Sequence, residues 1–464
     1  MNRFEPKRRW RRGRTALRLL ILDLVVVVAL ASLRTGTRPQ VSIDPALPGF
    51  GRGTPVEITA STVGRGLAQL RVVVRQGDLD MTLVDEEYQT RPAWAFWGPR
   101  TLQETIELEV GSETVTGLEE GEATLEVEAI APGTWLRKSP TELVRQQYPV
   151  MLRPPVLSAV STQHYPAQGG SEVVIYRVGK TSIRDGVRSG DSWFPGYPLP
   201  GGSADMRFAL FAVPFDLEDS DLVRLEAEDV LGNRAQTAFI DKFLPRPYRS
   251  DRISVSDRFM AKVVPEIQAN TPGLAAGDNL LEDYLAINRD LRQANTQTLL
   301  ELAGDSRPEF LWKSRFESLP NAQVMSAFAD RRTYMYEGKE VDYQDHLGFD
   351  LASVKQAPIP SANAGIVVLS RYFGIYGNTV VVDHGYGLMS LYGHLSSREV
   401  EPGQLVERGQ ILGTTGQTGL AAGDHLHFTI LLHGEAVNPI EWWDAKWIRD
   451  RLKRKLGSAL PFAE

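Results

Sequence analysis

The chain has 464 residues, too many for one ordinary domain, so we expect two to four folded units that each bury a core. It contains no cysteine, which excludes disulfides, thiolate metal sites and a cysteine nucleophile, so any metal must be held by nitrogen and oxygen atoms. Nine of the 51 basic and two of the 58 acidic residues lie in residues 1–34; the remaining 42 basic and 56 acidic residues give a net charge of −14, which argues against nucleic acid as a partner.

The amino terminus carries a targeting signal. A basic tail, residues 1–14, precedes an apolar run from Leu19 to Leu33 that only Asp23 interrupts. Counted as residues 15–34, the segment is just long enough to span a bilayer, and basic residues before such a span stay in the cytoplasm. An uncleaved anchor and a signal peptide cut after Ala31 both fit this pattern. We favour the single-pass anchor, with the body of the chain outside the cytoplasm.

From residue 41 the sequence is typical of β-structure. Segments such as PVEITAS and ATLEVEAIAP alternate apolar and polar residues between Gly, Pro and Asp turns. The pair Pro154 and Pro155 divides the region. We therefore expect two β-sandwich (Ig-like) modules, residues 41–153 and 154–250, that act as spacers or docking modules without chemistry.

The pattern changes to the helical period over residues 254–320, with Ser254 or Ser256 as the cap of the first helix. The stretch PEFLWKSRFESL, residues 308–319, belongs to this segment. Strands return from residue 341 between glycine-rich turns. Residues 446–464 are expected to form a basic amphipathic helix and a tail, with the charges on a solvated face.

Six of the seven histidines lie between His346 and His433. His346 and Asp350 are four residues apart, which puts them on one face of a strand or a helix. His425 and His427 would project to one face of a strand, as two metal ligands, as one ligand beside an acid/base group, or as a structural pair. Two histidines and one aspartate leave a fourth coordination position open, which is the arrangement of catalytic zinc. Without cysteine, zinc is favoured over metals that prefer softer ligands.

Four segments, HLGFDLAS, GNTVVVDHGYGLMSLYGHLSS, GQLVERGQILGTTGQTGLAAGDHLHFTI and NPIEWW, together resemble the lysostaphin-like, LytM-type zinc metallopeptidases, which cut peptide cross-links in bacterial cell walls. The resemblance covers residues 325–445 and implies an antiparallel β peptidase domain (duplicated hybrid motif). It also implies one zinc ion, Zn2+, held by His346, Asp350 and His427.

The same resemblance implies catalytic roles for His394 and His425, without deciding which is the general base. We interpret His384 as structural. Asn378, between Gly377 and Thr379, is a candidate substrate contact or a turn residue.

These observations predict a multidomain, mainly β protein with an N-terminal membrane anchor. Its expected function is that of a zinc endopeptidase, attached to the inner membrane and facing the periplasm, that hydrolyses peptidoglycan cross-links. In a diderm envelope the expected bond joins D-alanine to diaminopimelate. A non-catalytic regulator of a separate cell-wall amidase, which would have lost a zinc ligand, and an adhesion protein built on the sandwiches are the alternatives. We also expect the helical segment 254–320 to regulate access to the catalytic groove.

Overall fold

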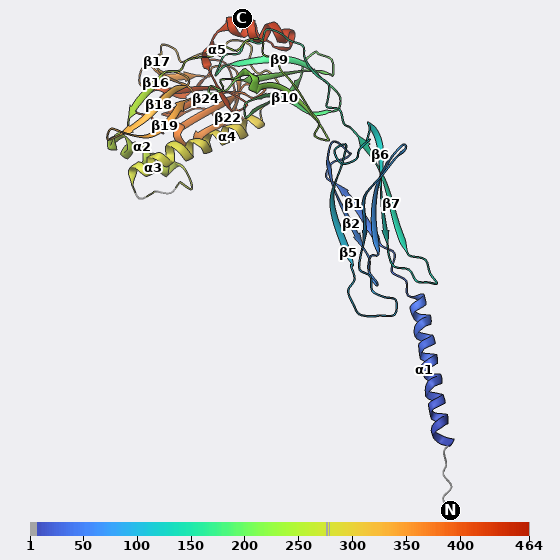
Figure 1. Cartoon of the computed structure of the whole chain (residues 1–464). Coiled ribbons are helices and arrows are strands. Elements are labelled where there is room, and N and C mark those ends of the chain that lie inside the picture. Colours follow the sequence, from blue (N-terminus) through green and yellow to red (C-terminus); the bar gives the residue numbers. More distant parts are fainter. Residues whose placement is uncertain (1–6, 275–276, 278, 464) are drawn as a thin grey trace, which may run out of the picture. The chain divides into compact units, whose positions relative to one another are not determined.

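The computed structural model describes residues 7–274, 277 and 279–463, and these form a mainly β protein (Figure 1). The chain divides into two compact units. The first consists of Met1–Pro154 with Glu228–Arg234, and the second of Pro155–Ala227 with Ala235–Glu464.

The first unit begins with helix α1 (Lys7–Leu33). Within the described residues, this is the one helix long and apolar enough to cross a membrane, over Arg14–Leu33 with a mean hydropathy of 2.5. A signal sequence passes the same test of length and composition, so the anchor stays a prediction.

Seven antiparallel strands follow α1 in the first unit. They are β1 (Gln40–Pro45), β2 (Thr54–Ser61), β3 (Gln69–Gln76), β4 (Leu79–Glu87), β5 (Gln103–Val110), β6 (Gly121–Ile130) and β7 (Thr141–Val150). They make two sheets, ordered β1-β2-β5 and β4-β3-β6-β7. Alternate side chains of each sheet, such as Ile58 in β2 and Val72 in β3, are fully buried in one shared core. This is the β-sandwich that the alternating pattern predicts.

The second unit opens with a further pair of four-stranded sheets. The strands are β8 (Leu157–Ala159), β9 (Ser171–Val178), β10 (Ser182–Ser189), β11 (Ser192–Pro195), β12 (Tyr197–Pro198), β13 (Met206–Ala212), β14 (Val223–Asp229) and β15 (Arg234–Thr237), with the 3-10 turn η1 (Ser220–Leu222). The sheet orders are β11-β10-β14-β15 and β12-β13-β9-β8.

This second β module shares its hydrophobic core with the C-terminal part of the chain. One cluster of buried side chains runs from Val173 in β9 to Trp442 near the carboxy terminus. The buried carboxylate of Glu441 accepts hydrogen bonds from the Ser171 amide, at 2.7 Å, and from Arg246, at 3.1 Å. The module is therefore continuous with the C-terminal domain and is not a freely hinged spacer.

Helices α2 (Asp257–Asn270), α3 (Leu280–Ala286) and α4 (Arg292–Gly304), with the π-helical turn η2 (Ile287–Leu291) between the last two, follow the module. Of the two expected caps, Ser256 is the one used, because its side chain accepts a hydrogen bond from the Phe259 amide. Figure 1 shows the three helices on one side of the C-terminal strands.

The prediction of a helix over residues 308–319 is wrong. This stretch has no regular structure, although Trp312 and Phe316 are fully buried. Its backbone amides donate to carbonyls far away in the sequence instead of to carbonyls four residues earlier, as Leu311 does to His384 and Phe316 does to Trp442. An apolar spacing of three to four residues therefore reflects burial of an irregular segment here, and not a helix.

The C-terminal domain contains the remaining strands. They are β16 (Ser250–Ser254), β17 (Gln323–Ser326), β18 (Asp330–Tyr336), β19 (Lys339–His346), β20 (Phe349–Ala352), β21 (Pro358–Pro360), β22 (Gly365–Tyr372), β23 (Asn378–Asp383), β24 (Leu388–Leu395), β25 (Ser397–Arg398), β26 (Leu405–Val406), β27 (Ile411–Thr414), β28 (Leu426–Leu432) and β29 (Glu435–Val437), with the 3-10 turn η3 (Gly374–Tyr376). The main sheet is ordered β17-β20-β28-β24-β23-β22-β26, and β29 pairs with β28. Two three-stranded sheets, β21-β27-β25 and β16-β18-β19, complete the domain.

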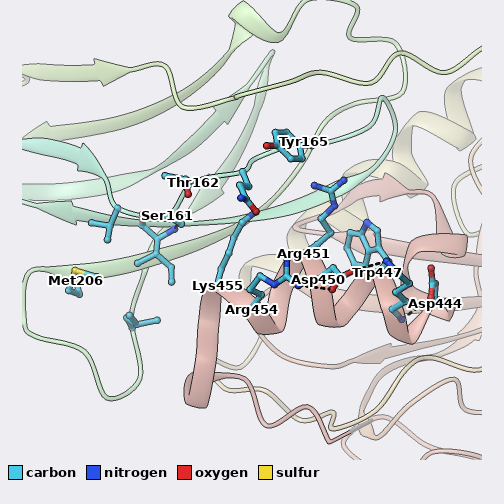
Figure 2. A pocket seen from close by; sticks show the side chains of 15 residues that line it. Ser161, Thr162, Tyr165, Met206, Asp444, Trp447, Asp450, Arg451, Arg454 and Lys455 are labelled. Carbon is cyan, nitrogen blue, oxygen red and sulfur yellow. Dashed lines mark hydrogen bonds and ion pairs between the residues drawn. The ribbon is translucent and has the colours of Figure 1, made fainter.

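The chain ends in short helical turns: α5 (Pro439–Trp443), α6 (Ala445–Trp447), π-helical η4 (Ile448–Lys453), α7 (Arg454–Leu456) and η5 (Gly457–Ala459). The expectation that their charges all face solvent is wrong for Lys455, which lies 2.7 Å from the fully buried carboxylate of Glu172 in β9. Burial raises the pKa of Glu172 and lowers that of Lys455, in each case against their mutual attraction. In Figure 2, Lys455 lines a cavity of about 750 Å³ together with Ser161 and Thr162 of the β module.

Replacing Lys455 with Met should lower the free energy of unfolding of the second unit by about 3 kcal/mol, because Glu172 would lose its closest cation inside the protein. The matched control is Lys446→Met. Lys446 is 78% exposed and lies 2.7 Å from Asp450, so its loss should cost less than about 1 kcal/mol. Guanidinium titration followed by tryptophan fluorescence measures both values. Equal losses in the two variants would contradict this account of the ion pair.

Candidate active site

Three neighbouring strands bring the predicted site residues together. In the antiparallel register of β20 and β28, Asp350 lies directly opposite His427. On the other side of β28, His427 lies opposite Gly393 of β24, the residue before His394. His346 is the last residue of β19, and the turn after it leads into β20. Residues far apart in the chain therefore meet at one place on the main sheet.

His346, Asp350 and His427 form a cluster of three potential metal ligands. The Asp350 Oδ1 atom lies 2.9 Å from His346 Nε2 and 3.0 Å from His427 Nδ1. The two imidazole nitrogens lie 3.1 Å from each other. These are the three residues that the sequence resemblance implies as metal ligands.

The hydrogen bonds on the far side of each imidazole decide which nitrogen faces the cluster. His346 Nδ1 lies 3.0 Å from the Ala327 carbonyl, which can only accept, so this nitrogen carries the proton. The Thr429 hydroxyl donates to the Leu347 carbonyl and must therefore accept from His427 Nε2, at 3.0 Å. Both imidazoles consequently direct an unprotonated nitrogen at the cluster. Two lone pairs and a carboxylate oxygen then face one another, and a cation satisfies all three, so the residues fit a metal ion.

Arg332 in β18 is a site residue that sequence reasoning missed. Its guanidinium donates to Asp350 Oδ2 at 2.8 Å and leaves Oδ1 for the cluster. Burial opposes the charge on Asp350, but positive charge on the imidazoles, His346 first, outweighs burial when they are protonated and holds the pKa of Asp350 well below its usual range. Neither Arg332 nor Thr429 belongs to a pattern visible in the sequence, because each is defined by what it contacts across strands.

His394 is directed into the site by an irregularity in β24. The register between β23 and β24 shifts at this point, and His394 has a positive φ of 66°, which non-glycine residues seldom adopt. Its Nδ1 donates to the Thr418 carbonyl at 2.8 Å, so Nε2 remains an acceptor. Burial lowers the pKa of His394 well below its ordinary value, and a neutral imidazole at this position can take a proton.

His425 lies one residue before β28, in an isolated bridge with Gly416. Its Nδ1 donates to the Gly423 carbonyl, and its Nε2 lies 3.5 Å from Asp350 Oδ1. Burial opposes the positive charge, but the contact with Asp350 outweighs it and raises the pKa of His425. The His394 and His425 rings are 4.9 Å apart. Both side chains of the His-x-His pair therefore face the cluster, as the strand pattern predicts.

These five side chains line a cavity of about 450 Å³. The opposite wall comes from the helical segment, through Phe259, Tyr284, Asn288 and Arg292. The segment is fixed there by a hydrophobic cluster that joins Val264 and Tyr284 to Tyr334 and Ile375 of the C-terminal domain. The helices thus form part of the cavity, and their expected role in regulating access stays a prediction.

Asn378 and His384 lie outside this cavity. The Asn378 amide donates to the Leu395 carbonyl at 3.2 Å, which holds β23 against β24, so its contact with substrate stays a prediction. His384 is fully buried, with Nδ1 2.8 Å from the Ala364 carbonyl and Nε2 2.8 Å from the Ser390 hydroxyl. These partners agree with the structural role assigned to His384.

Comparison with known proteins places this site within a family. The model of peptidase family M23 matches residues 344–439. Peptidoglycan DD-endopeptidase ShyA of Vibrio cholerae is 40% identical over 217 residues, 38% of this chain and 50% of that protein. Peptidoglycan DD-endopeptidase ShyC of the same organism is 36% identical over 117 residues, 25% of this chain and 26% of that protein.

The chain therefore spans half or less of the length of these relatives. Among solved structures, the catalytic domain of lysostaphin from Staphylococcus simulans is 25% identical, with 27% of this chain and 94% of that chain covered at a TM-score of 0.23. The family match begins two residues before His346 and ends after His427. It therefore includes the five side chains that line the cavity. Residues 344–439 of this chain are a peptidase family M23 domain.

Proposed function

We propose that the protein is a zinc-dependent endopeptidase that hydrolyses peptide cross-links of peptidoglycan. The observation that carries this proposal is the convergence of His346, Asp350 and His427 on one point, with His394 and His425 beside it in the same cavity. Three nitrogen and oxygen ligands with room for a fourth are typical of catalytic zinc, whereas structural zinc is closed by four protein ligands.

The protein's own residues supply the proton transfers. Zinc held by the three ligands would provide a Lewis acid that makes hydroxide available near neutral pH and polarises a carbonyl. The Nε2 atoms of His394 and His425 face the cavity, because the Nδ1 of each is bonded to a backbone carbonyl. One imidazole takes a proton from water on Nε2 and passes it to the leaving amine, and the other, in its protonated form, donates from Nε2 to the developing oxyanion.

Peptidoglycan is proposed as the substrate because the curated relatives carry that substrate in their names. The location is consistent with it. We infer that α1 anchors the chain in the inner membrane, with the basic tail in the cytoplasm and the body in the periplasm, where the cell wall lies.

A non-catalytic regulator of a separate amidase is the alternative. Such a protein has no use for an intact ligand set. Here His346, Asp350 and His427 are all present, and contacts with Ala327 and Thr429 orient both imidazoles toward the cluster. This orientation favours the enzyme, since a regulator gains nothing from it.

Replacing Thr429 with Val should weaken zinc binding about 10- to 100-fold, because His427 Nε2 would lose the acceptor that fixes its tautomer. Competition with a chromophoric chelator on the metal-free protein measures the affinity directly. Thr54→Val is the matched control, since Thr54 is also buried and also donates to a carbonyl, that of Gly49 in the first unit. Unchanged affinity in Thr429→Val would contradict the proposed orientation of His427.

Loss of a catalytic imidazole should separate metal binding from turnover. His394→Ala and His425→Ala should keep stoichiometric zinc and lose about 100-fold or more of the activity on purified sacculi. His346→Ala and His427→Ala should lose zinc as well. Mass spectrometry of new amino termini, with sacculi from a diderm and from a glycine-bridged wall, identifies the bond. If the zinc-loaded wild-type protein releases no new amino termini from either wall, the proposed function is wrong.

A further inference from the structure

Among the residues that the structure describes, one wall of the active-site cavity carries a cation without an anionic partner. Arg292, the first residue of α4, lines the cavity and is half-buried. Its Nε donates to the Asn288 carbonyl at 3.1 Å, and its Nη2 donates to Asn288 Oδ1 at 2.7 Å. Both acceptors are neutral, so they fix the position of the guanidinium without balancing its charge.

The nearby carboxylates are already engaged. Asp350 is the one acidic residue among those that line the cavity, and it is bonded to Arg332 and to the imidazoles. Asp342 accepts from Arg289 at 2.8 Å and from the Asn288 amide at 2.7 Å. Over the described part of the chain, no carboxylate lies within ion-pair distance of Arg292. In a chain with an acidic body, this cavity therefore has an excess of positive charge.

The guanidinium lines the same cavity as Tyr376 and the site histidines. Burial raises the pKa of Tyr376, and the positive charge of Arg292 opposes that rise. The Tyr376 ring is 5.4 Å from the ring of His427. Arg292 also follows a π-helical turn, Ile287–Leu291, a local irregularity that is frequent at functional sites.

A half-buried, uncompensated guanidinium is energetically costly, and an anion bound beside it would relieve that cost. We propose that Arg292 binds a free carboxylate of the substrate close to the scissile bond. This inference rests on the proposed peptidase function and narrows its substrate class. A cross-link through diaminopimelate, a diamino acid with two carboxyl groups, keeps a free carboxylate next to the peptide bond, whereas a glycine bridge has none there. The helical segment, which lies outside the family match, thus supplies a residue that determines specificity.

The test compares two purified peptide dimers joined by a D-alanyl–diaminopimelate bond, one with the diaminopimelate carboxylate free and one with it converted to the amide. Wild-type, full-length protein should show kcat/KM about 10- to 100-fold higher for the free carboxylate. Arg292→Gln should lose this preference through a higher KM for the free acid, with little change for the amide. Arg292→Lys should keep part of the preference, because the charge remains.

Arg258→Gln is the matched control, since Arg258 is an exposed arginine of α2 that does not line the cavity, and it should keep the full preference. Persistence of the preference in Arg292→Gln, or an equal loss for both dimers, would overturn the proposal. Binding of the two dimers to zinc-loaded His425→Ala protein, with and without Arg292→Gln, gives the same comparison without turnover. If wild-type protein cleaves neither dimer, the peptidase function has failed, and the binding preference still decides the role of Arg292.

Discussion

The mutual approach of three hydrogen-bond acceptors is the constraint around which the C-terminal domain is organised. His346 Nε2, Asp350 Oδ1 and His427 Nδ1 lie 2.9–3.1 Å from one another, with the lone pairs of all three directed inward. A single proton can bridge only one of these pairs, whereas a divalent cation interacts favourably with all of them. The β20–β28 register, the turn after β19 and the bulge in β24 each place one group of this site.

These three side chains cannot turn away from that point, because their remaining polar atoms are occupied. The Ala327 carbonyl, the Thr429 hydroxyl and the Arg332 guanidinium each bind the far side of one of them. These partners come from strands or turns whose positions the sheet already fixes. The orientation of these side chains therefore follows from folding. The free energy of folding of the whole domain offsets the repulsion between the three acceptors.

How much of this could be predicted depends on sequence separation. His346 with Asp350, and His425 with His427, lie within five residues, so strand or helix geometry alone puts each pair on one face. The two pairs are far apart in the chain, 81 residues for His346 and His427, and the choice of His427 as the ligand comes from the family resemblance. Contacts without a local pattern were missed, among them Arg332 with Asp350. The apolar spacing around Trp312 predicts a helix that the structure lacks. Hydrophobic spacing indicates which residues are buried, and not which carbonyls accept their backbone hydrogen bonds.

The helical segment is tied to the catalytic machinery by more than the cavity wall. Glu266 of α2 accepts hydrogen bonds from the Gly419 amide and the Tyr372 hydroxyl. The residue before Gly419, Thr418, provides the carbonyl that fixes the tautomer of His394. Any displacement of α2 would therefore disturb this loop and the imidazole of His394 together. A segment that only blocked the cavity could move away and leave the site unchanged. This segment contacts the loop that orients His394, which is the arrangement expected of a cavity wall that helps to bind substrate.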